Sequence, residues 1–138
     1  VKASKSLIRD FGELENLQVS AKGPGDFVSS SDKKTEKTII DELQKAHSDY
    51  GIMTEESGFI NKSNKKNRWI IHPIDGTLNF SRGFPMAAIS IALWRDMRPI
   101  LGIVQNIFSD VCGVNLPDIY TVNQNCSFRR AQDTCNQS

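Results

Sequence analysis

The sequence contains little that points to a membrane, to secretion or to nucleic acid. It has no long apolar run and no apolar signal core near its start, so we expect no membrane segment. Its three cysteines are widely spaced and form no Cys-x-x-Cys pair, which argues against a zinc site built on thiolates and predicts reduced thiols in the cytoplasm. The net charge of +1 provides no basic surface for nucleic acid.

The hydrophobic content of 38% in 138 residues is sufficient for one folded domain with a core. The spacing of apolar and turn residues predicts an N-terminal helix, a weak strand at 16–21, a turn at 23–25, a helix over 33–47, strands at 52–53 and 69–74, and an antiparallel pair at 87–94 and 100–108. We therefore expect an α+β domain in which helices are layered on a mainly antiparallel sheet. We expect residues 1–115 to form this domain and residues 116–138, which lack a sustained period, to form a poorly ordered tail.

The segment from Trp69 to Phe80 is the most informative part of the chain, because an apolar strand there runs into Asp75, Gly76 and Thr77. A carboxylate at a strand end can bind a cation, and the N–H groups of Gly76 and Thr77 can face an anion if they open a helix. Taken alone, an Asp-Gly pair after an apolar run is also an ordinary turn.

A second acidic cluster, Glu55 and Glu56, follows the strand at 52–53, so both clusters should leave neighbouring strand ends. Adjacent glutamates are often only a solvated edge, and we expect Glu56 to be a neighbour of the site rather than a ligand. Asp32 precedes the helix predicted over 33–47 and is a candidate N-cap as well as a candidate site residue.

These stretches together resemble the inositol monophosphatase family, whose hallmark is Asp-Pro-Ile-Asp-Gly-Thr-x-Asn-Phe. The chain matches that run except that His72 stands where the first aspartate belongs. Residues 22–29 leading to Asp32, and residues 54–57, fit two further family motifs in the same order. The similarity extends to about Val114 and is greatest to the bacterial inositol-1-monophosphatases, also called extragenic suppressor proteins.

The resemblance implies the N-terminal half of the inositol monophosphatase and sugar phosphatase fold. It also implies Mg²⁺-dependent hydrolysis of a small phosphate monoester, such as inositol 1-phosphate, by an activated water without a protein nucleophile. The resemblance assigns metal binding to Glu55, Asp75, the carbonyl of Ile74 and the position occupied by His72. It assigns the orientation of the attacking water to Asp32 and Thr77, with Glu55 also catalytic through its metal. It assigns phosphate binding to Gly76 and Thr77.

His72 is the first departure from the family pattern. A neutral imidazole has one available lone pair, cannot bridge two ions as a carboxylate does, and suits zinc or copper better than Mg²⁺. We expect the site to lose at least one ion, so that the protein is catalytically weak or uses another metal. The alternative is that His72 is only a tolerated residue near the end of the strand.

Length is the second departure, because the resemblance covers only the N-terminal half of the family's domain. The absent part carries a further metal-binding aspartate and most groups that hold the inositol ring. Without it, an exposed sheet edge and an apolar face should promote association or a homodimer. Three hypotheses remain: a Mg²⁺-dependent phosphatase, a non-catalytic binding or regulatory module of the extragenic suppressor type, and a degraded gene product.

Overall fold

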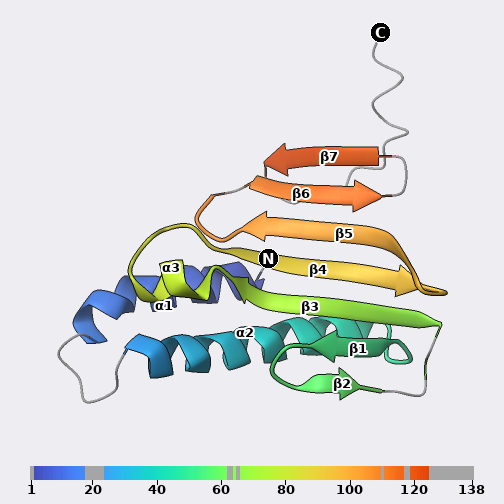
Figure 1. Cartoon of the computed structure of the whole chain (residues 1–138), viewed down its shortest axis with the longest axis horizontal. Helices are drawn as coiled ribbons and strands as arrows, with labels where there is room; N and C mark the ends of the chain where they lie inside the picture. The colour runs from blue at the N-terminus through green and yellow to red at the C-terminus, as the bar shows by residue number, and fades with distance from the viewer. Residues whose placement is uncertain are drawn as a thin grey trace, which may run out of the picture.

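The computed structural model describes residues 2–17, 24–61, 64, 66–109, 111–116 and 119–124. Its elements, in chain order, are α1 (Lys2–Leu17), α2 (Pro24–Ala46), β1 (Gly51–Thr54), β2 (Gly58–Ile60), β3 (Asn67–Asp75), α3 (Thr77–Ser81), β4 (Ala88–Arg95), β5 (Arg98–Asn106), β6 (Val111–Leu116) and β7 (Ile119–Gln124). Among the described residues, the strands form one sheet in the order β2-β1-β3-β4-β5-β6-β7 (Figure 1). Only β1 and β3 are parallel neighbours within it, so the predicted α+β class with a mainly antiparallel sheet is confirmed.

Helices α1 and α2 lie against one face of this sheet (Figure 1). Successive strand side chains point to opposite faces, so alternate residues such as Trp69 and Ile71 are buried under the helices. Apolar side chains at helical spacing, including Leu7, Leu14 and Ile39, complete this core. No helix in the described part of the chain combines the length and the apolar character needed to span a bilayer.

The hairpin of β4 and β5 confirms the predicted antiparallel pair. Arg95 pairs with Arg98, and the two turn residues Asp96 and Met97 have φ values of 49° and 65°. Positive φ at both central positions matches the right-handed twist of the flanking strands. Further along, β7 pairs with β6, although the sequence predicts no strand in the region assigned to a tail. The domain boundary at 115 itself stays a prediction.

The start of α2 corrects two predictions. The helix begins at Pro24, so residues 24 and 25 are helical rather than part of a turn, and Asp32 lies inside the helix rather than at its N-cap. Proline is well suited to the first helical position, where its missing N–H has no intrahelical partner to lose. The strand predicted at 16–21 is also wrong at its start, because α1 continues to Leu17; residues 18–21 lie outside the described residues.

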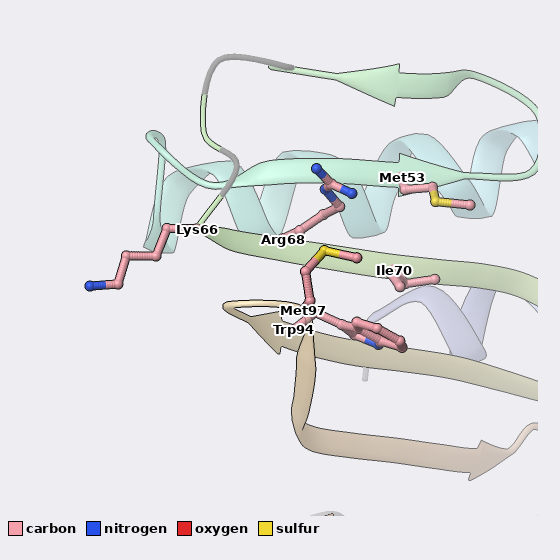
Figure 2. Close-up of a pocket in the computed structure, with 6 residues that line it drawn as sticks. All are labelled: Met53, Lys66, Arg68, Ile70, Trp94 and Met97. Carbon is pink, nitrogen blue, oxygen red and sulfur yellow. The ribbon is translucent and has the colours of Figure 1, made fainter.

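The face of the sheet opposite the helices carries a shallow apolar pocket of about 220 Å³ (Figure 2). Met53 of β1, Ile70 of β3 and Trp94 of β4 point into it, and Met97 of the hairpin turn closes one side. Arg68 lies at its margin and places its guanidinium 5.2 Å from the ring centre of Phe59. Apolar side chains therefore occur on both faces of the sheet, but α1 and α2 cover only one.

Candidate functional site at the ends of β1 and β3

The candidate site lies where the parallel strands β1 and β3 end side by side. Thr54, the last residue of β1, pairs with Ile71 of β3, so Glu55 emerges beside the strand that carries His72 and Asp75. The ends of parallel neighbouring strands meet at one edge of a sheet. The prediction that both acidic clusters leave neighbouring strand ends is confirmed.

His72 lies between two carboxylates of this edge. Its Nδ1 is 2.8 Å from Oε2 of Glu55, and its Nε2 is 3.7 Å from Oδ1 of Asp75. All three side chains remain accessible, with exposed fractions of 42% for His72, 60% for Glu55 and 67% for Asp75. The structure thus brings three of the predicted site residues together, with the imidazole at the centre.

Asp32 reaches the same region from α2. With Glu55 and Thr77 it lines a cleft of about 370 Å³, whose other lining residues are Val28, Ser29, Glu56, Leu78 and Ser81. Its exposed fraction is 7%, and its Oδ1 has no hydrogen-bond partner. The pKa of Asp32 is raised to about 6. Burial is the largest cause, followed by the nearby carboxylates of Glu56 and then Glu55, whereas His72 has a weaker effect in the opposite direction. A buried carboxyl without a partner is costly in a purely structural position.

Gly76 connects Asp75 to the short helix α3 and is required by the backbone. Its φ is 89°, and a Cβ atom at this position would lie 2.8 Å from the carbonyl oxygen of Met86. Its own carbonyl accepts a hydrogen bond from the N–H of Phe80 at 3.0 Å, which closes the first turn of α3. The prediction that Gly76 and Thr77 open a helix is confirmed, and that helix has five residues.

The Asn79-Phe80 part of the Asp-Gly-Thr-x-Asn-Phe run is structural. Asn79 donates from Nδ2 to the carbonyl oxygen of Met86 at 3.2 Å, and so ties α3 to the segment that leads into β4. Phe80 is completely buried and makes edge contacts with Phe11 of α1 and tilted contacts with Phe108. The pattern that reveals the site is therefore partly a packing pattern, because Asn79 and Phe80 position α3 while Asp75 and Thr77 carry the polar groups assigned to the site.

Glu36 is a site residue that the sequence reasoning missed. It is 98% buried, since its exposed fraction is only 2%, and its carboxylate accepts hydrogen bonds from the hydroxyls of Thr54 and Ser57. It also accepts from the backbone N–H of Glu56 at 3.2 Å. These bonds hold the turn that follows β1, and this turn presents Glu55.

A signal for Glu36 is present in the helix periodicity. Val28, Asp32, Glu36 and Ile40 recur every four residues and therefore lie on one face of α2, and all four are buried. Two acidic residues within a buried stripe call for hydrogen-bond partners. The signal was hidden because the helix was predicted to begin after Asp32. Residues 22 and 23 of the first family-like stretch lie outside the described residues.

The donor set fits Mg²⁺ only in part. Glu55 and Asp75 supply oxygen atoms of the kind that Mg²⁺ prefers, whereas His72 supplies nitrogen. No group of three histidine, cysteine, aspartate or glutamate side chains among the described residues is arranged to hold a metal ion. A pair of Mg²⁺ ions bridged at position 72 does not fit this chain. The ligand role of the Ile74 carbonyl stays a prediction.

A model of the inositol monophosphatase family matches residues 1–134 of the chain. The chain belongs to this family. The match continues beyond Val114, to which the similarity was expected to extend. The inositol-1-monophosphatase of Mesorhizobium japonicum is 50% identical over 106 residues, which are 77% of this chain and 40% of that protein.

Solved structures confirm the fold. The extragenic suppressor protein suhB from Bartonella henselae superposes with a TM-score of 0.75 at 41% identity, covering 94% of this chain and 50% of the other. SaIMPase-II with inositol monophosphate bound superposes with a TM-score of 0.64 at 28% identity, covering 90% and 44% of the two chains. The chain thus spans 40% to 50% of the length of these relatives.

Proposed function

We propose that the cleft between α2 and α3 binds a small phosphate monoester of the inositol phosphate type and supports its hydrolysis. The observation that carries the proposal is Asp32, whose buried and unpartnered oxygen lines the same cleft as Glu55 and Thr77. The inositol monophosphate bound in SaIMPase-II, a structural relative, supports the substrate class.

The residues of the cleft divide the work by their chemistry. Asp32 and the Thr77 hydroxyl orient the attacking water, and a carboxyl whose pKa is about 6 can accept a proton near neutral pH. The backbone N–H groups of Gly76 and Thr77 face the phosphate, and Glu55, Asp75 and the Ile74 carbonyl offer oxygen donors to a cation. Mg²⁺, when bound, would neutralise phosphate charge and lower the pKa of the water.

His72 sets the expected level of activity. Its Nδ1 engages one oxygen of Glu55, and its nitrogen stands where the family pattern has a carboxylate, so we expect weak hydrolysis with Mg²⁺. The same contact favours a second candidate function, a non-catalytic phosphate-binding or regulatory module. The structural relative from Bartonella henselae, an extragenic suppressor protein, supports this second candidate.

The test is phosphate release from inositol 1-phosphate at varied Mg²⁺ by the unchanged chain and by three variants. His72→Asp restores a carboxylate and should increase the Mg²⁺-dependent rate, whereas Asp32→Asn should abolish it. Asp41→Asn changes an exposed carboxylate on the same helix and should leave the rate unchanged. Release that survives Asp32→Asn would contradict the proposed role of the cleft, and phosphate binding without release by either the chain or His72→Asp would favour the binding module.

A cytoplasmic location and self-association belong to the proposal as well. The wide spacing of the three cysteines supports a reducing compartment. The uncovered apolar face around Met53, Ile70 and Trp94 supports association between copies, because exposed apolar patches commonly form interfaces. Light scattering of the purified chain measures the mass of the assembly directly.

A further inference from the structure

The two ring nitrogens of His72 face different carboxylates at unequal distances. Nδ1 is within hydrogen-bond distance of Glu55 Oε2, at 2.8 Å. Nε2 is 3.7 Å from Asp75 Oδ1, which is too long for a hydrogen bond. The imidazole therefore has one nitrogen that is held and one that is directed toward a carboxylate without bonding to it.

A β-bulge creates the second of these approaches. Residues three apart in a regular strand point to opposite faces, so His72 and Asp75 should not meet. In β3, however, His72 pairs with Ser90 and Asp75 pairs with Ala88. Three residue steps on β3, from 72 to 75, therefore lie opposite two steps on β4, from 90 to 88. The extra residue returns Asp75 to the side of the sheet occupied by His72.

The contact with Glu55 determines which nitrogen is free. A proton on Nδ1 donated to the Glu55 carboxylate leaves the lone pair on Nε2, on the side of Asp75. Histidines that bind metals usually have this arrangement, with the second ring N–H donated to a carboxylate that fixes the tautomer and the ring orientation. Glu55 then acts on the imidazole rather than as a direct ligand.

The gap between Nε2 and Asp75 has the size of a shared ion. Zn²⁺ binds imidazole nitrogen and carboxylate oxygen at about 2.0–2.2 Å each, so two such donors on one ion can lie up to about 4 Å apart. The observed separation of 3.7 Å falls within this limit. The exposed surfaces of His72 and Asp75 leave room for water or a phosphate oxygen at the remaining positions.

Asp32 provides an independent indication that a ligand binds in the cleft beside Glu55, which adjoins His72. Its Oδ1 is buried without a partner and lines the cleft that Glu55 also lines. Water bound to a cation beside Glu55 and His72 is a hydrogen-bond donor that this carboxylate lacks in the protein alone.

We propose that this chain binds a divalent ion of the zinc type between Nε2 of His72 and the carboxylate of Asp75, with Glu55 orienting the imidazole. The inference deepens the proposed function, on which it rests for the location of the site. It replaces Mg²⁺ preference by preference for an ion that accepts nitrogen, and it changes the role of Glu55 from a donor to the cation to a residue that orients His72. Imidazole and carboxylate together suit Zn²⁺ and Co²⁺, whereas Mg²⁺ prefers oxygen donors alone.

The first test is calorimetric titration of the chain with Zn²⁺ alone and with Mg²⁺ alone, without any phosphate ester. We expect Zn²⁺ to bind at least about tenfold more tightly than Mg²⁺. His72→Gln and Asp75→Asn should each remove the Zn²⁺ preference, and Glu55→Gln should weaken Zn²⁺ binding by about 10–100-fold. His47→Gln removes the other histidine of the chain and should change nothing.

The second test needs no variant and so does not depend on how a substituted chain folds. In the ¹⁵N spectrum of the histidine rings, Zn²⁺ should shift Nε2 of His72 strongly and its Nδ1 much less, while His47 stays unchanged. This readout also separates the site from Zn²⁺ bound by Cys112, Cys126 or Cys135. Zn²⁺ binding that leaves the His72 resonances in place, or equal binding of Zn²⁺ and Mg²⁺, would overturn the inference.

The outcomes also separate the inference from the proposed function. Zn²⁺ binding that depends on His72, without phosphate release under any condition, supports the metal site and contradicts hydrolysis. Phosphate release with Mg²⁺, together with no shift of the His72 resonances by Zn²⁺, supports hydrolysis and contradicts the zinc site.

Discussion

Asp32 and Glu36 lie one turn apart on the same face of α2, and both are almost completely buried, yet their carboxylates are in opposite situations. Glu36 accepts hydrogen bonds from Thr54, Ser57 and the N–H of Glu56. Asp32 retains an oxygen atom with no partner. Two acidic residues of one helix therefore differ in what surrounds them rather than in burial.

The difference teaches which carboxylate supports the fold and which is available to a ligand. A satisfied carboxylate stabilises its surroundings, and Glu36 thereby fixes the turn that presents Glu55. An unsatisfied one destabilises the folded chain unless something else binds it. We therefore expect substitution of Glu36 to reduce stability and substitution of Asp32 to reduce activity.

The largest effect on stability is expected for Glu36→Ala. The change leaves two hydroxyls and one backbone N–H without their acceptor and opens a cavity, so the free energy of unfolding should fall by about 3 kcal/mol. Urea denaturation followed by circular dichroism measures it. Asp41→Ala, on an exposed part of the same helix, is the control and should change stability little; equal losses in the two variants would contradict the distinction.

Asp32→Asn should reduce the rate of phosphate release without reducing stability. The rate of phosphate release should fall by about 100-fold or more, because the water loses its orienting carboxylate. The free energy of unfolding at pH 7 should not fall, because an uncompensated charge has been removed from a buried position. Kinetics and urea denaturation of one preparation decide the question, and a loss of stability as large as that of Glu36→Ala would show that Asp32 is structural.

The dependence of stability on pH should also distinguish Asp32. Burial raises its pKa from 3.8 to about 6, so between these values the folded state binds more protons at this residue than the unfolded state. Its contribution to the free energy of unfolding is therefore full below 3.8, decreases as the pH rises and is lost above about 6. Subtracting the profile of Asp32→Asn from that of the unchanged chain isolates this decrease, and a difference that rises with pH would have the wrong sign.

The smallest effect is expected for Ser57→Ala, which removes one of the three donors to Glu36. The remaining two still engage the carboxylate, so the loss should be about 1 kcal/mol. Ser48→Ala at an exposed turn is a matched control, because the Ser48 hydroxyl is not among the donors to Glu36. A loss as large as that of Glu36→Ala would mean that Ser57 alone holds the turn.

The sequence predicts that Glu55 and Asp75 lie close together because each stands at the end of a recognisable strand, and His72 lies within the second of these strands. It does not predict the neighbours of Glu36, because they are 18 to 21 residues away and the bonds form only when α2 packs against the end of β1. The beginning of α2 was misplaced because Pro24 and Gly25 are typical of turns as well as of a first helical turn. The bulge beside Asp75 has one sign in the sequence, Pro73, because a proline cannot donate to the ladder of a central strand and is tolerated at bulges.

The opposite faces of β3 and β4 each hold one of the two tryptophans of the chain. Trp69 is 7% exposed beneath the helices, whereas Trp94 borders the uncovered apolar pocket. Trp94→Phe leaves an emission signal from the helix-covered side alone, and Trp69→Phe leaves one from the bare side alone. The protein thus contains its own pair of optical reporters. If their unfolding transitions in denaturant coincide, the sheet and its helices come apart in a single cooperative step.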